Sequence, residues 1–216
     1  MAGIGFQLKK LLGRRTLLGA ALAYGHAAVI STGPWLMAIL ALGGLTLVVP
    51  AAVSERELWL FRAIVIYAYA VSFVTLGPYQ LPLTRHLADR IYLKDFKSIV
   101  PIFFTSLLLG LPVQAVAAAL LFGQADVPPL FTVLAVALSV VISLVWHAMI
   151  FLSAAQDYAS IVKAFAIGVA ASLGAGWFLG TRMGGVGSLM GFLAGQALLW
   201  FLLMRRVLAE FLPTDR

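Results

Sequence analysis

Cysteine is absent from the 216-residue chain. Without a thiol the chain has no disulfide, no thiolate nucleophile and no Cys-ligated metal site. Charged residues are also scarce, at 11%, whereas apolar residues make up 62% and the mean hydropathy is +1.03. A soluble domain carries roughly 25% charged residues, so this chain lacks the side chains that cover a water-facing surface. The composition indicates a membrane protein and excludes a sizeable aqueous domain.

Several kinds of catalytic site are missing as well. The acids Asp126 and Asp157 fall in short connections, and none lies deep in an apolar stretch. There is no Walker-type glycine loop, no GxSxG motif and no paired-carboxylate glycosidase motif. Three scattered histidines without thiols do not have the spacing of metal ligands. We therefore expect no enzymatic activity, no cofactor and no bound metal.

Long apolar runs, in contrast, are abundant. A membrane-spanning helix needs about 20 apolar residues, and six stretches meet that length: about 17–49, 58–82, 99–122, 130–154, 161–180 and 186–204. They predict an all-α polytopic transmembrane bundle of six spans. The expected domains are a cytoplasmic amphipathic segment at 1–16, the transmembrane domain at 17–206 and a cytoplasmic tail at 207–216.

The basic residues predict the orientation of these spans. Twelve of the fifteen Lys and Arg fall on one side: Lys9, Lys10, Arg14, Arg15, Arg85, Arg90, Lys94, Lys97, Lys163, Arg205, Arg206 and Arg216. Cytoplasmic loops collect Lys and Arg, so both termini should face the cytoplasm. This asymmetry accounts for the net charge of +7 without a nucleic-acid partner.

Three ionisable residues lie inside the predicted spans and are candidates for a transport path: His26, Arg62 and His147. Such residues are costly in hydrocarbon and are functional candidates by default. Each also has a structural interpretation, because Arg62 can extend to the membrane surface, His26 lies near the inner interface and His147 can be an ordinary buried histidine.

Two Gly-Pro pairs interrupt the first two spans, at Gly33-Pro34 and Gly77-Pro78. Proline removes a backbone donor and clashes with the preceding turn, so each pair should kink or break its helix. Interrupted spans point to the binding site in many transporters. A purely structural kink is the alternative.

A charged connection at 84–97 follows the second span. Arg85 and Asp89 have the i, i+4 spacing of a helical ion pair, so part of this connection should be helical. With Arg90 they form a candidate docking loop for a cytoplasmic partner or for anionic lipid headgroups. The alternative is a set of solvated charges.

Small residues recur every four positions on the last two spans. Gly187, Gly191 and Gly195 share one face of the sixth span, and the fifth has a matching row of Gly168, Ser172, Gly176 and Gly180. Such rows let a neighbouring helix approach closely. The neighbour can be within the bundle, or it can belong to a second copy or a second half.

Three stretches together resemble one known family, the PelG exopolysaccharide transporters. The residues that carry the resemblance are MAGIGF at 1–6 with LKKLL at 8–12, Ala23-Tyr24 with ISTGPW at 30–35, and Gly77-Pro78 followed by Leu81, LTR at 83–85 and LADR at 87–90. The resemblance implies a relative of the multidrug/oligosaccharidyl-lipid/polysaccharide flippases, in which two six-helix halves surround a central cavity. It also implies a polysaccharide substrate at the bacterial inner membrane, a Pel-type glycosyltransferase and other inner-membrane Pel subunits as partners.

Members of that family are roughly twice as long as this chain, so the resemblance covers their N-terminal half. The chain is then either a fragment or a half-size protein that pairs with a second copy. Two rival functions remain: a non-transporting scaffold that anchors a polysaccharide synthase through the 84–97 connection, and a membrane enzyme acting on lipid-linked sugars.

Overall fold

The computed structural model describes residues 39–40, 42–44, 47 and 53–212. Several predictions fall outside these residues: the amphipathic segment, nearly all of the first span with His26, Gly33 and Pro34, and the last residues of the tail.

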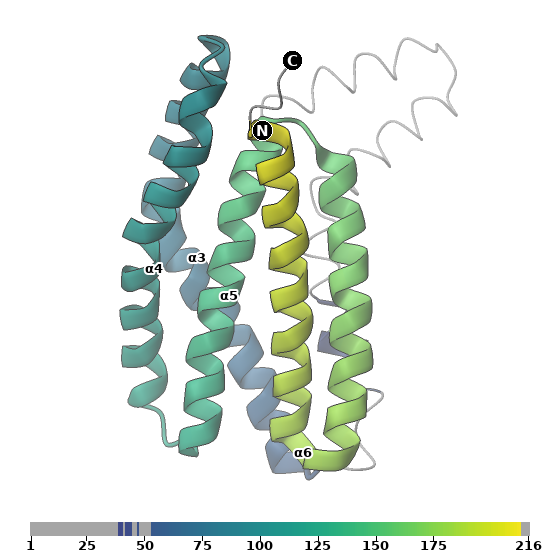
Figure 1. Cartoon of the computed structure of the whole chain (residues 1–216). Helices are drawn as coiled ribbons and strands as arrows, with labels where there is room; N and C mark the ends of the chain where they lie inside the picture. Colours follow the sequence, from purple (N-terminus) through teal and green to yellow (C-terminus); the bar gives the residue numbers. More distant parts are fainter. Residues whose placement is uncertain (1–38, 41, 45–46, 48–52, 213–216) are drawn as a thin grey trace, which may run out of the picture.

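Four long helices and one short helical turn make up the regular structure between residues 53 and 212 (Figure 1). They are α3 (Glu55–Tyr92), the 3-10 turn η1 (Phe96–Ser98), α4 (Ile99–Gly123), α5 (Pro129–Ala154) and α6 (Tyr158–Phe211). The four long helices are apolar and long enough to cross a membrane. α3 begins at a reciprocal cap, in which the Ser54 hydroxyl accepts from the Glu57 amide and the Glu57 carboxylate accepts from the Ser54 amide.

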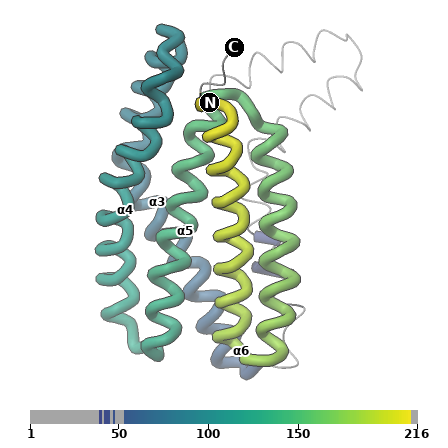
Figure 2. Tube along the Cα trace, in the orientation of Figure 1, coloured from purple at the N-terminus to yellow at the C-terminus, as the bar shows by residue number. Residues whose placement is uncertain are grey.

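α6 is a hairpin of two helical arms. Gly184 has φ 65° and ψ −147°, a conformation that is open essentially only to glycine. The chain reverses there, and the first arm, residues 158–183, lies beside the second, residues 185–211 (Figures 1 and 2). The predicted fifth and sixth spans are these two arms, and the predicted second, third and fourth spans lie in α3, α4 and α5.

The arms of α6 approach closely because glycines face the contact. A Cβ at Gly191 would lie 2.3 Å from the carbonyl carbon of Ala175, and one at Gly195 would lie 2.1 Å from the Ser172 hydroxyl. A Cβ at Gly187 would lie 2.1 Å from the Leu179 carbonyl oxygen. This glycine face is therefore covered by the first arm and is not open to a second copy.

α3 continues through the Gly77-Pro78 pair. Pro78 and Pro82 both lie inside the 38-residue helix, so a break, one of the two outcomes expected there, is not observed. The helix also extends beyond the apolar run and takes in the first part of the charged connection, as far as Tyr92.

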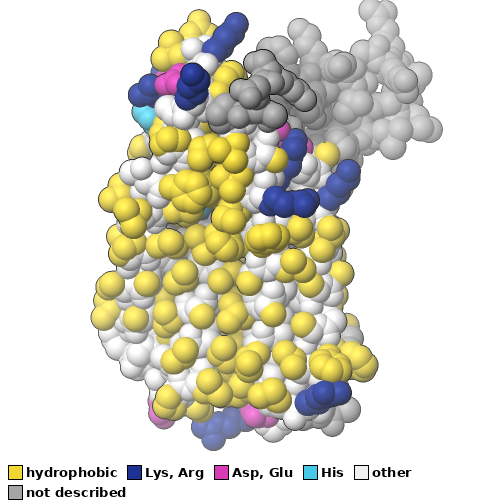
Figure 3. All heavy atoms as spheres, in the orientation of Figure 1, with side chains coloured by type: hydrophobic (Ala, Val, Ile, Leu, Met, Phe, Trp, Pro, Cys, Tyr) yellow, Lys and Arg dark blue, Asp and Glu magenta, His cyan; other side chains and the backbone are white. Residues whose placement is uncertain are grey.

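α5 is the central helix, because it packs against α3, α4 and α6. Its buried side chains join two apolar clusters, one around Phe103 and Phe151 and the other around Phe61 and Phe192. On the face in Figure 3, hydrophobic side chains cover the middle of the molecule, and charged side chains lie at its two ends. This distribution fits a protein whose middle is solvated by lipid.

Candidate functional site

His147 lies on α5 in a pocket lined by aromatic rings. Its side chain is 1% exposed. The centres of the Phe103 and Phe151 rings lie 5.6 Å from the centre of the imidazole, and that of Tyr79 lies 6.2 Å away. The pocket thus combines residues of α3, α4 and α5, which the sequence separates widely.

One polar partner reaches the imidazole. The Oγ of Ser106, on α4, lies 2.8 Å from Nε2 of His147. The same hydroxyl also lies within donating distance of two carbonyl oxygens of its own helix, 2.6 Å from that of Ile102 and 3.0 Å from that of Phe103. Which of Ser106 and Nε2 donates depends on the tautomer of the imidazole. Nδ1 is buried and has no hydrogen-bond partner among the described residues, so the pocket contains one polar ring nitrogen that is not satisfied by a described side chain.

A second polar group joins α3, α4 and α5 inside the bundle. The Ser72 hydroxyl donates to the carbonyl oxygen of Ser139 at 2.9 Å, and the amide nitrogen of Gln114 donates to Ser72 at 3.3 Å. Thr75 donates to the amide oxygen of Gln114. Ser72, Gln114 and Ser139 are at most 1% exposed, so these bonds replace water for buried polar atoms and hold the three helices together.

A third polar group ties α3 to both arms of α6. The Tyr69 hydroxyl donates to the Gln196 amide oxygen at 3.4 Å, and the Gln196 amide nitrogen donates to the Ser172 hydroxyl, also at 3.4 Å. Gln196 and Ser172 are buried. These polar atoms satisfy one another, so this part of the bundle interior has little free capacity to hold a polar substrate.

The structure does not bring the candidate path residues together. Arg62 is half-buried on α3, 17 positions before the Tyr79 ring that contacts His147, which corresponds to about 25 Å along a helix. His26 lies outside the described residues. Within the described residues, the three candidates therefore do not line a common path.

The predicted docking loop forms the end of α3 and its connection to α4. Arg85 and Asp89 form the expected i, i+4 ion pair at 3.4 Å, with side chains 84% and 59% exposed. Arg90 pairs with Asp95 at 3.0 Å. Exposed pairs of this kind contribute about 0–1 kcal/mol, so these charges are available to an external partner without a large loss of stability.

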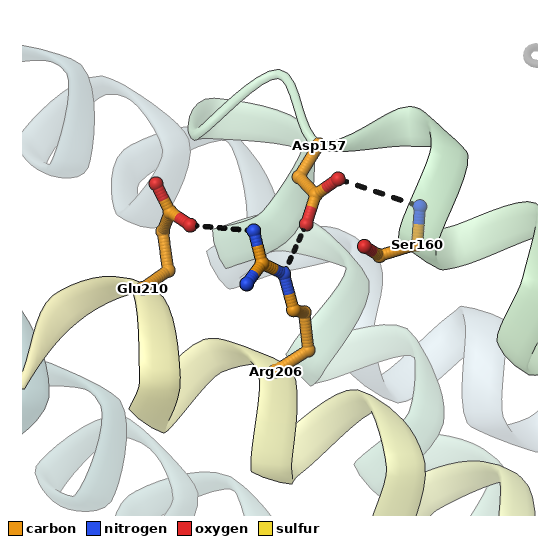
Figure 4. Close-up of polar contacts among 4 residues, drawn as sticks. All are labelled: Asp157, Ser160, Arg206 and Glu210. Atoms are coloured by element: carbon orange, nitrogen blue, oxygen red, sulfur yellow. Dashed lines mark hydrogen bonds and ion pairs between the residues drawn. The ribbon is translucent and has the colours of Figure 1, made fainter.

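A clip of charged residues at the open end of the α6 hairpin was not anticipated. Asp157 accepts from the Arg206 guanidinium and from the Ser160 amide, and Arg206 also donates to Glu210 at 2.8 Å (Figure 4). Burial opposes ionisation of Asp157, but the bonds from Arg206 and Ser160 outweigh it and lower the pKa of Asp157. The clip fixes the start of the first arm to the end of the second.

Sequence reasoning missed the partners Ser106, Gln114 and Gln196. It considered only ionisable residues within the apolar runs, whereas uncharged amides and hydroxyls carry most of the interhelical hydrogen bonds. Glutamine inside an apolar span was the available signal, because an amide in hydrocarbon needs a partner.

Comparison with known families places these features in context. A family model named PelG, with the description "Putative exopolysaccharide Exporter (EPS-E)", matches residues 1–216. No curated protein and no solved structure matches the chain. The family match spans the sequence from end to end and agrees with the motifs that suggested the resemblance. The chain belongs to the PelG family.

Proposed function

We propose that this chain forms one wall of a transporter that carries a Pel-type exopolysaccharide across the bacterial inner membrane. It would cross that membrane six times with both termini in the cytoplasm, as one half of a flippase-type transporter, and would act without enzymatic activity. A second half or a second copy would supply the opposite wall. A glycosyltransferase and other inner-membrane Pel subunits would supply the polymer.

The family match is the observation that carries this proposal. Two structural features support it. The long helices have the length and composition of membrane spans, and hydrogen bonds between the helices close much of the bundle interior, which suits a wall better than a complete pore. The substrate path would then lie between this bundle, as one wall, and a second bundle, as the other.

Deletion of the gene and its complementation test the transport role. We expect cells that lack the protein to keep making polymer but to retain it inside, and the complementing gene to restore polymer outside the cell. Polymer measured separately in washed cells and in medium distinguishes export from synthesis. Normal export after deletion would refute the proposal.

The scaffold alternative gives a different result in the same cells. The variant Arg85→Glu/Arg90→Glu reverses two charges at the exposed end of α3. A scaffold would lose the glycosyltransferase from the membrane fraction, and polymer synthesis would fall with it. A transporter would keep the enzyme and its product in the cell while export alone declines.

A further inference from the structure

Two backbone carbonyls of α3 have lost their regular partners. In an α-helix each carbonyl accepts from the amide four residues later, and proline has no amide proton. Pro78 therefore leaves the carbonyl of Val74 without that donor, and Pro82 does the same to the carbonyl of Pro78. No side chain of the described residues donates to either oxygen, whereas Thr84 does donate to the nearby Gln80 carbonyl.

Both carbonyls lie on the side of α3 that faces away from the bundle. This proline face consists of Val74, Gly77, Pro78, Leu81 and Pro82, all of them exposed. Val74 is 74% exposed and Leu81 is 79% exposed. A Cβ added at Gly77 would meet nothing within 4 Å. The opposite side of the helix holds the buried Leu76 and Leu83, so both carbonyls belong to the face that the described helices leave exposed.

Lipid is a poor neighbour for this face. Acyl chains have no hydrogen-bond donors, and each unsatisfied carbonyl in hydrocarbon costs several kcal/mol. A second copy of the same face is also a poor neighbour, because its side chains are aliphatic or absent and donate nothing. An occupant with hydroxyl donors would satisfy both carbonyls.

Resting on the proposed function, we infer that the proline face of α3 lines the polymer path and that the Val74 and Pro78 carbonyls accept hydrogen bonds from the hydroxyl groups of the polysaccharide and its water. A sugar polymer has many hydroxyl donors, and each hydroxyl can rotate to point its proton at an acceptor. Backbone acceptors one turn apart suit such a chain, because they bind weakly enough to let it slide.

α3 is distinguished from its neighbour α4 by two successive acceptors. On α4 a single Pro112 removes the donor to the Leu108 carbonyl. On α3 the two freed carbonyls follow each other at successive turns beside Gly77, which has no side chain to shield them. The path is therefore assigned to α3.

The absence of cysteine provides a direct test of water access. Single variants Val74→Cys and Ile167→Cys can be made in the native chain, because it contains no other thiol. The two positions lie at similar levels along the bundle. Tyr69 and Ser172 both contact Gln196, and Val74 on α3 and Ile167 on the proline-free first arm each lie five residues from these anchors, in the same direction. Ile167 is exposed as well, at 51%.

The thiolate is the reactive form and needs water to ionise. We expect a small water-soluble maleimide to label Val74→Cys in membranes at least about tenfold faster than Ile167→Cys. Equal, slow labelling would mean that lipid or another segment of this chain covers the face, and an oxidative crosslink between two Val74→Cys chains would mean that a second copy covers it. Either result would overturn the inference. Neither depends on export, so the labelling also separates its failure from failure of the proposed function.

Export then tests the hydrogen bonds themselves. Pro78→Ala restores a donor for the Val74 carbonyl and improves the helix, so the variant should fold. We expect export to fall by about three- to tenfold, the value of one hydrogen bond. The control Gly77→Pro/Pro78→Ala keeps a proline, and so a bend, in the helix. Its proline frees the Phe73 carbonyl instead, which lies on the side where the Phe73 ring packs against Trp146. If the acceptor matters, export falls in both variants at equal membrane abundance; export retained in the control would show that only the bend matters.

Discussion

Replacing Gly191 by alanine should force the two arms of α6 apart. The new Cβ would lie 2.3 Å from the Ala175 carbonyl carbon and 2.4 Å from the Gly176 nitrogen, whereas real Cβ atoms do not approach closer than 3.0 Å. Both neighbours are backbone atoms and cannot rotate away, so the arms must separate locally by at least about 0.7 Å. A gap of that size forfeits roughly a quarter to a half of the dispersion energy of the contacts it opens.

The expected net cost follows from two opposing effects. Overpacking of this kind costs up to about 3 kcal/mol, and alanine recovers about 1 kcal/mol of helix propensity relative to glycine. We therefore expect Gly191→Ala to lower the free energy of unfolding by about 2 kcal/mol.

Denaturation of the purified protein in mixed micelles, followed by circular dichroism, measures this change. The matched control is Gly174→Ala, on the first arm, where an added Cβ meets nothing within 4 Å. The control should be unchanged or stabilised by up to about 1 kcal/mol. If both variants unfold at the same denaturant concentration, the close contact between the arms does not exist in the folded protein.

Three further predictions concern the turn, the clip and the buried histidine. Gly184→Ala should lower the free energy of unfolding by about 1–3 kcal/mol, because alanine is strained at the positive φ of this turn. A change below about 0.5 kcal/mol in the same micelle assay would show that this residue does not have a positive φ in the folded protein. The pKa of Asp157 is lowered in the folded protein, so its contribution to stability is present above the ordinary carboxyl pKa and is lost as the pH falls through the lower pKa of the folded state. Asp157→Asn should therefore remove that part of the acid dependence of stability. An unchanged pH profile of stability would show that Arg206 does not stabilise the carboxylate. If the buried pocket lined the path, His147→Leu would abolish export at unchanged membrane abundance. Because His147 lies inside the bundle and the proposed route runs outside it, we expect export to persist, and its loss at normal abundance would place the route in the pocket.

Hydropathy predicts the middle of each helix well and its ends less well. The predicted stretches 99–122 and 130–154 agree closely with α4 and α5, because charged residues, Gly or Pro flank both. α3 is longer than the apolar run at 58–82, since its cap at Ser54 and its charged last turns are helical although they are not apolar. An apolar window stops at the first cluster of charges, but helical hydrogen bonding does not.

The contacts around the candidate site could not be predicted in the same way. Gly77-Pro78 was expected to interrupt its helix, but proline removes only one hydrogen bond locally, and the rest of the α3 ladder carries the helix through. The partnership of His147 with Ser106 joins residues 41 positions apart. Nothing in the local sequence of either residue specifies the packing of α4 on α5 that brings them together.

The location of unsatisfied polar atoms suggests how the bundle is used. Inside it, Gln114 and Gln196 make bonds across helices and so lock α3, α4, α5 and α6 into one unit. Outside it, α3 presents acceptors at Val74 and Pro78 that no described side chain satisfies. A bundle whose helices are joined by interior hydrogen bonds, and whose outer face has free acceptors, is suited to guide a polar chain along its surface. A polymer that entered the bundle would have to break these interior hydrogen bonds, whereas a polymer on the proline face would break none. The energetically accessible route therefore runs along the proline face, between this bundle and whatever forms the opposite wall.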